Sequence, residues 1–224
     1  MERNNWKQYA FIFAIIGSAL YIILTFIGMM FYTGGNRVNN NEPGYNFFYN
    51  YFSDLGRTKS YSGQDNTVSM ILYIIATGVF GLSLIPFSIA FRDFFKETNE
   101  SLSKKGTIFG LLAGVCTFVY AVTPYDISPL FRLFHGLFVL IAYPALGVMG
   151  IMYSKVMLKS DYPKPYPRIF VSLFVIYFIG LSLNFFGSPF LIRILGQKIH
   201  KYATMICFII QGYGAWKLET SGNP

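Results

Sequence analysis

One uncharged stretch decides the fold class: residues 8–36 read QYAFIFAIIGSALYIILTFIGMMFYTGGN, without an Asp, Glu, Lys or Arg. A helix of about 20 residues crosses the roughly 30 Å hydrocarbon layer of a bilayer, so this stretch is long enough to span a membrane. Five more uncharged stretches follow, and only the last is shorter than a span. They lie at 66–91, 106–125, 133–154, 169–192 and 202–216. The pattern predicts an all-α polytopic membrane protein, a bundle of six transmembrane helices.

The composition agrees with this class. Of the 224 residues, 54% are hydrophobic and 12% are charged, whereas about a quarter of the residues in an ordinary soluble domain are charged. The spans use nearly the whole chain, so we expect one transmembrane domain, residues 1–224. The expected spans are about 9–32, 67–91, 106–123, 131–154, 168–187 and 199–217, with an outer loop at 33–66.

The sixth predicted span has the shortest uncharged stretch, so its flanking lysines must be accommodated. We expect it to cross with Lys198, Lys201 and Lys217 lifting their ammonium groups to the interfaces, while their stems stay in the apolar layer.

Lysine and arginine predict the orientation. With the N-terminus inside, 11 of the 18 fall on the inner side and 7 on the outer side, and the short segments 92–105 and 155–168 carry four each. The positive-inside rule therefore predicts that both termini are cytoplasmic, in a protein expected in the plasma membrane. Although the net charge is +8, the basic residues are scattered through short loops, which disfavours a nucleic-acid partner and suits lipid headgroups.

Ionisable groups in or beside a span are costly and are therefore functional candidates. The topology places four of them on the outer side: Asp54 in the first outer loop, Asp126 after span three, His135 one turn into span four, and His200 at the start of span six. We expect one cavity facing the outer leaflet to gather them.

Each candidate also has a structural interpretation. Asp54 could cap a short helix, and Asp126 could be a turn residue or helix N-cap. His135 could be a neutral, packed histidine that donates to a carbonyl. His200 could be an exposed imidazole near the interface that needs no partner.

Two kinds of chemistry suit a shared cavity. His135, His200, Asp126 and Asp54 could hold a divalent metal such as zinc with a position left for water. Alternatively, an Asp could make a His basic without metal, with Ser53 as a nucleophile. The chain has two histidines and neither HxxxH nor HExxH spacing, which argues against the metal; the sequence does not identify a cofactor.

Basic residues around the expected cavity indicate its ligand. Arg132, Arg193 and Lys198, with Lys201 nearby, suit an anionic phosphate group, which points to a lipid or lipid-linked substrate.

A ladder of small residues runs along one face of span three: Gly106, Gly110 and Gly114. Such a ladder lets another helix approach closely. It could pack inside one bundle or between two chains, so a homo-oligomer stays open.

Three short motifs carry a family resemblance. They are Ser53-Asp54-Leu55-Gly56 after an aromatic loop, Thr123-Pro124-Tyr125-Asp126 followed by His135, and Leu195-Gly196-Gln197-Lys198. They resemble the "ISDLG", "FPxD…H" and "GLxxR"-like motifs of an uncharacterised prokaryotic six-span family. This sequence has Thr123 where that family often has Phe, and Lys198 where Arg is usual. The resemblance does not extend to His200.

That family is in turn similar to the eukaryotic Frag/DRAM/Sfk family. The resemblance implies a six-helix bundle with its polar residues facing away from the cytoplasm. It also implies lipid handling, because the eukaryotic relatives include proteins that remodel the lipid of glycosylphosphatidylinositol anchors or organise plasma-membrane lipid.

The sequence leaves three candidate functions. The first is lipid handling at an outer-leaflet site, with membrane lipids as partners; if catalytic, the protein would be a membrane-embedded lipid hydrolase or an acyl or headgroup transferase. The second is a non-enzymatic lipid-binding or scaffold protein. The third, a small transporter, is disfavoured because the candidate groups lie at one edge of the membrane.

Overall fold

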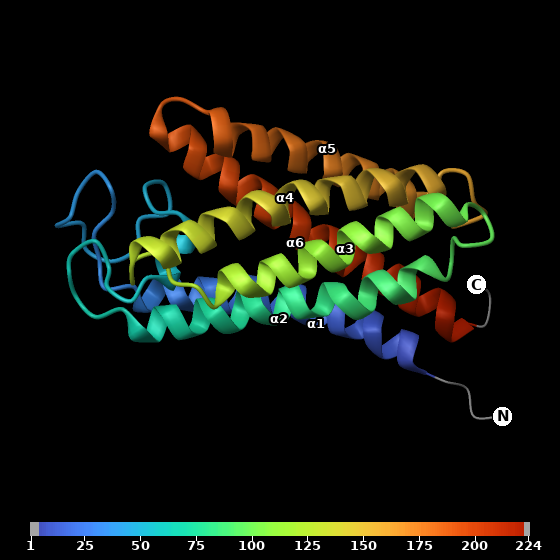
Figure 1. The fold of residues 1–224 in the computed structure, drawn as a ribbon, viewed down its shortest axis with the longest axis horizontal. Coiled ribbons are helices and arrows are strands. Elements are labelled where there is room, and N and C mark those ends of the chain that lie inside the picture. Colours follow the sequence, from blue (N-terminus) through green and yellow to red (C-terminus); the bar gives the residue numbers. More distant parts are fainter. Residues whose placement is uncertain (1–4, 222–224) are drawn as a thin grey trace.

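Six long helices run side by side in the computed structural model, which describes residues 5–221 (Figure 1). A short 3-10 helix, η1, interrupts the first loop, and the described residues form no strand beyond an isolated bridge between Lys59 and Asp65. The all-α prediction is confirmed. The helices are α1 Trp6–Phe31, α2 Thr67–Arg92, α3 Glu100–Ala121, α4 Pro129–Met157, α5 Pro165–Phe186 and α6 Phe190–Ser221, and η1 is Phe52–Gly56.

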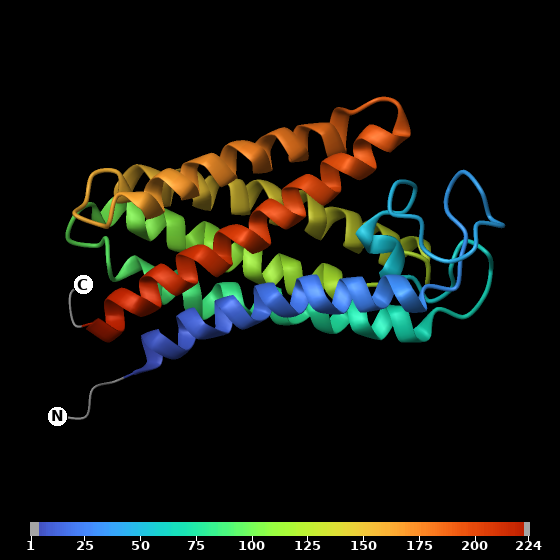
Figure 2. The same ribbon diagram turned by 180° about the vertical axis from the view of Figure 1, so that it is seen from behind.

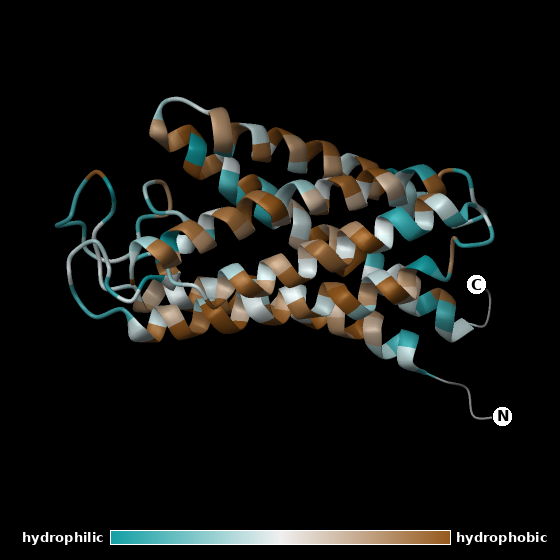
Figure 3. Cartoon of the chain, viewed as in Figure 1, coloured by the Kyte–Doolittle hydropathy of each residue, from teal (hydrophilic) through white to brown (hydrophobic). Residues whose placement is uncertain are grey.

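Five of these helices, α1 to α5, are long and apolar enough to cross a membrane. Large apolar side chains such as Ile23, Phe26 and Leu140 lie exposed on their outer faces. Apolar residues cover most of the bundle's length, and polar residues gather toward its two ends (Figure 3). A surface of this kind fits a hydrocarbon solvent, because each helix satisfies its own backbone hydrogen bonds. The chain is an integral membrane protein.

Helix α6 buries a cluster of polar side chains inside the bundle: Gln197, Lys198, His200 and Lys201. It begins at Phe190 rather than near residue 199, and it packs against α1 and α5. As a result, Lys198 and Lys201 are only 3% and 5% exposed. The prediction that these two lysines extend their ammonium groups out to the membrane interfaces is wrong, because both groups are enclosed by the protein: that of Lys198 meets the Asn50 carbonyl of the first loop, and that of Lys201 meets the Tyr120 hydroxyl.

Consecutive helices run in opposite directions, so their connections gather at two ends of the bundle (Figure 2). The long loop between α1 and α2 shares one end, here called the loop end, with the α3–α4 and α5–α6 connections. The opposite end, called the terminal end, holds both ends of the described chain and the remaining two connections. This grouping agrees with the spans expected from the sequence.

Local capping explains where two of the helices begin. The Ser128 side chain accepts a hydrogen bond from the Phe131 N–H at 3.2 Å, and Pro129 occupies the first turn of α4. In the same way, Asn99 accepts from the Leu102 N–H at 2.9 Å at the start of α3. Such caps satisfy N–H groups that have no partner inside the helix. Ser128, and not Asp126, is therefore the N-cap of α4.

The glycine ladder of α3 packs inside the bundle. A Cβ atom placed on Gly114 would lie 2.8 Å from the carbonyl oxygen of Gly81 on α2. Gly106 faces the ring of Tyr153, and Gly110 faces the side chain of Ser88. All three neighbours belong to the same chain, so the ladder brings α2 and α4 close to α3.

The two helices α4 and α5 diverge toward the loop end (Figure 1). The contact between α4 and α5 is much smaller than the contact of α4 with α3 or of α5 with α6. The α5–α6 hairpin therefore leans away from α4 at the loop end, which positions the cavity described next.

Candidate functional site

A cavity of about 230 Å³ lies at the loop end, between the first loop and helices α4 and α5. Its polar lining comes mainly from the loop, whereas Val139 of α4 and Phe185 of α5 contribute apolar walls. Gly136 of α4 and four tyrosines also line it: Tyr51, Tyr73, Tyr125 and Tyr143. The charged, hydroxyl, imidazole and amide groups are Arg37, Ser53, Asp54, Arg57, His135, Asn184 and Gln197.

Asp54 belongs to η1 and is 4% exposed. Its carboxylate accepts hydrogen bonds from the Tyr51 backbone N–H at 2.8 Å and the Asn50 amide at 3.4 Å. Burial raises the pKa of Asp54 above its ordinary value, although the Tyr51 N–H and the charge of Arg37 act in the opposite direction. The structure thus gives Asp54 the capping contact that its sequence allowed and also places it in the cavity wall.

His135 lies in the second turn of α4 and is buried. Its Nδ1 is 2.9 Å from the carbonyl oxygen of Thr123. A carbonyl oxygen can only accept, so Nδ1 carries the proton of this bond and Nε2 of the neutral ring is an acceptor. The rings of Tyr120 and Tyr125 pack edge-on against the imidazole, with centroids 5.6 and 5.9 Å away. His135 therefore has a defined orientation in the cavity wall.

Two arginines that the sequence did not predict as site residues, Arg37 and Arg57, line the cavity. The Arg37 Nε donates to the Tyr61 hydroxyl at 2.8 Å, and its guanidinium lies over the Tyr51 ring. Arg57 follows η1 directly, and its guanidinium lies 4.2 Å from the centroid of the Tyr61 ring. Neither arginine forms an ion pair with a carboxylate in the described part of the chain. The one sequence feature that could have indicated a role for Arg57 in the site is its position directly after Ser53-Asp54-Leu55-Gly56.

Asp126 is not among the residues that line this cavity. Its carboxylate accepts three hydrogen bonds, from the Thr58 N–H at 3.0 Å, the Thr58 hydroxyl at 2.8 Å and the Lys59 N–H at 3.0 Å. Partial burial raises its pKa, but these hydrogen bonds outweigh burial and lower the pKa of Asp126 below its ordinary value. Asp126 thereby ties the α3–α4 connection to the long loop that carries Arg57.

His200 also lies apart from the cavity, about ten residues into α6 and 1% exposed. The rings of Tyr143 and Tyr177 surround it, with centroids 4.7 and 5.7 Å from the imidazole. The alternative of an exposed imidazole at the interface is wrong, because α6 begins earlier than expected and carries His200 into the bundle.

Lys198 holds the first loop against α6. Its ammonium donates to the Asn50 carbonyl at 2.9 Å and to the Tyr45 hydroxyl, and it lies 4.1 Å from the centroid of the Phe52 ring. The neighbouring Gln197 accepts from the Phe52 N–H at 2.7 Å. These contacts explain why a lysine at this position is buried.

Arg132 and Arg193 are exposed at the loop end and do not line the cavity. The Arg132 guanidinium lies 5.0 Å from the centroid of the Tyr125 ring, and the Arg193 Nε donates to the Gly187 carbonyl at 2.9 Å. Both residues therefore lie outside the candidate site.

The proposed metal ligands do not gather. Between residues 5 and 221, no three His, Cys, Asp or Glu side chains lie close enough to hold a metal ion. Asp54 and His135 share the cavity, whereas Asp126 binds the loop backbone and His200 lies within the bundle. The described residues do not fit the predicted zinc site.

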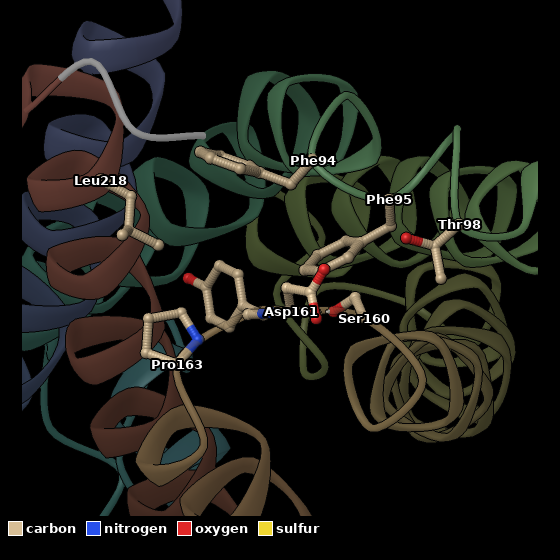
Figure 4. Close-up of a pocket in the computed structure, with 8 residues that line it drawn as sticks. Phe94, Phe95, Thr98, Ser160, Asp161, Pro163 and Leu218 are labelled. Carbon is tan, nitrogen blue, oxygen red and sulfur yellow. Dashed lines mark hydrogen bonds between the residues drawn. The ribbon is translucent and has the colours of Figure 1, made fainter.

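A larger cavity, of about 390 Å³, lies at the terminal end (Figure 4). Phe94, Phe95 and Thr98 come from the segment after α2, and Ser160 to Pro163 come from the α4–α5 connection. Its lining includes one carboxylate, Asp161, but no histidine or basic side chain. The combination of imidazole, hydroxyl and guanidinium groups is found at the loop end instead.

Comparison with known proteins places the chain in a family. Residues 15–198 match the family described as "Protein of unknown function (DUF998)". The matched range runs from α1 into α6; it includes Asp54, Asp126 and His135 and ends before His200. No curated protein and no solved structure matches the chain. Since the match covers most of the sequence, the chain belongs to the DUF998 family of proteins of unknown function.

Proposed function

We propose that this protein is a six-span membrane protein that binds a lipid with an anionic headgroup in the loop-end cavity. The observation that carries the proposal is that Arg37 and Arg57, neither of them ion-paired, line the same cavity as Ser53, Asp54 and His135. Guanidinium groups bind phosphate oxygens through directed, charge-assisted hydrogen bonds.

The location of the cavity favours a lipid over a water-soluble anion. Its walls include Gly136 and Val139 of α4 and Phe185 of α5, two helices that diverge at this end (Figure 1). Apolar side chains such as Leu137 and Leu140 lie exposed on α4 close by. A headgroup in the cavity would therefore leave its acyl chains against the lipid-facing surfaces of α4 and α5.

Binding is better supported than catalysis. A nucleophilic mechanism would need Ser53 activated by His135, and the described residues contain no hydrogen bond between these two side chains. The Nδ1 proton of His135 is held by Thr123, which leaves Nε2 to accept a hydrogen bond from a headgroup hydroxyl. We assign Asp54 the role of limiting the positive charge of the cavity and orienting η1.

The lipid preference can be tested by native mass spectrometry of the detergent-purified chain with added phosphatidylglycerol or phosphatidylcholine. We expect preferential binding of phosphatidylglycerol. Each of Arg37→Gln and Arg57→Gln is expected to weaken it by at least about tenfold, because a hydrogen bond to a charged group contributes about 1.5–3 kcal/mol. Arg193→Gln is the matched control, since Arg193 is exposed outside the cavity. Equal binding of the two lipids, or unchanged binding by both cavity variants, would contradict the proposal.

We further propose that α6 is the sixth span and that both termini are cytoplasmic, which places the cavity at the outer leaflet. Cys116 and Cys207 are buried, so single cysteines can be introduced over a low background. In intact cells, an impermeant maleimide is expected to label Asn40→Cys at the loop end and to spare Thr98→Cys and Thr220→Cys. Labelling of Asn40→Cys and Thr220→Cys alike would remove α6 as a span, and labelling of Thr98→Cys and Thr220→Cys but not of Asn40→Cys would reverse the orientation.

A further inference from the structure

A third, much smaller cavity lies deep in the bundle, beside His200 and Lys201 of α6. Its volume is about 10 Å³, close to the room that one water-sized particle needs. Tyr143 lines both this inner cavity and the loop-end cavity.

The polar groups around the inner cavity are incompletely satisfied. Lys201 is 5% exposed, and its ammonium has three N–H groups, of which one donates to the Tyr120 hydroxyl at 2.7 Å. No described carboxylate forms an ion pair with it. His200 is 1% exposed, and its Nε2 has no hydrogen-bond partner among residues 5–221. The cavity thus adjoins a buried cation and an unpartnered ring nitrogen.

Aromatic rings offset only part of the lysine's charge. The Lys201 Nζ lies 4.6 Å from the centroid of the Tyr143 ring and 5.2 Å from that of Tyr120. A cation over a ring face is stabilised, but a buried charge without a counter-ion remains costly. A water molecule could accept the free N–H groups, yet it would leave the charge uncompensated. An anion would accept hydrogen bonds from these N–H groups and would also compensate the charge.

We propose that the inner cavity binds a monatomic anion, with chloride as its ordinary occupant. The small volume excludes phosphate, carboxylates and lipid headgroups. The two remaining N–H groups of Lys201 would donate to the anion, and His200 would donate through Nε2 in the corresponding tautomer. This site is independent of lipid binding in the outer cavity.

The test is thermal unfolding of the detergent-purified full chain in sodium chloride and in sodium gluconate at equal concentration. At chloride a few times above its Kd, we expect Tm to be higher in chloride by roughly 2–4 °C, with bromide replacing chloride. Lys201→Met is expected to abolish this difference. Lys198→Met is the matched control, because Lys198 is a buried lysine of the same helix whose ammonium already meets the Asn50 carbonyl and Tyr45 hydroxyl.

Equal Tm values of the wild-type chain in the two salts would overturn the proposal, as would a chloride effect that persists in Lys201→Met. Should Lys201→Met fail to fold, bromide-soaked crystals of the wild-type chain decide the matter. An anomalous peak beside the Lys201 Nζ supports the site, and its absence overturns it. Neither result depends on whether Arg37 and Arg57 bind phosphatidylglycerol.

Discussion

Replacing Gly196 with alanine is expected to prevent α6 from packing on α5 and to remove most of the folded protein. A Cβ at this position would lie 2.6 Å from the carbonyl oxygen of Gly180 and 2.7 Å from the carbonyl carbon of Leu183. Both atoms belong to the backbone of α5, so neither can rotate away. Overpacking a well-packed contact typically costs about 1–3 kcal/mol, and a clash with backbone is expected to exceed this range.

The matched substitution is Gly136→Ala on α4. A Cβ there would meet nothing within 4 Å. Since alanine is better than glycine in a helix by about 1 kcal/mol, Gly136→Ala is expected to leave stability unchanged or raise it. Thermal unfolding and size-exclusion chromatography of both variants in one detergent make the comparison. A Gly196→Ala variant as stable as wild type would contradict the close crossing of α5 and α6.

Truncating Asp54 to alanine is expected to lower the free energy of unfolding by about 3 kcal/mol, because the buried Tyr51 N–H and Asn50 amide lose their charged acceptor. Asp54 is also the carboxylate that offsets Arg37 and Arg57 in the cavity lining. The substitution should therefore destabilise η1 and expose the long loop to trypsin. Asp54→Asn keeps the side-chain shape and is expected to lose less stability than Asp54→Ala.

The control for Asp54 is Asp65→Ala in the same loop. Asp65 is exposed, and its carboxylate accepts from the N–H and hydroxyl of Thr67 at the start of α2. Loss of a contact of this kind at a helix start costs about 1 kcal/mol. The measurements are thermal unfolding and the rate of tryptic cleavage after Arg57 and Lys59. Cleavage of Asp54→Ala no faster than that of Asp65→Ala would show that the carboxylate does not hold η1.

Much of the fold could be predicted because membrane helices have simple requirements. The five longest uncharged stretches correspond to α1 to α5. The start of α6 could not be placed in the same way, since a lysine at a membrane interface and a lysine buried among tyrosines look identical in a sequence. Lys198 and Lys201 are of the second kind. Their burial also explains why α6 is less apolar than the other helices.

The candidate site was predictable only in part. Ser53, Asp54 and His135 line one cavity, as expected, whereas Asp126 and His200 do not. Position in the topology predicts the end of the bundle at which a residue lies, but not the direction of its side chain. The two arginines were missed as cavity residues because Arg37 and Arg57 are held there by aromatic rings and hydrogen bonds between distant loop positions.

The sequence by itself determined that the chain is helical and integral to a membrane. Its uncharged stretches can enter hydrocarbon only when every backbone hydrogen bond is made locally, and α-helices meet that condition without knowledge of their neighbours. The tertiary structure alone decided which polar groups meet. Helix rotation and crossing depend on close contacts such as Gly180 with Gly196 and Gly81 with Gly114, and these contacts join residues too far apart in the chain for any local pattern to specify.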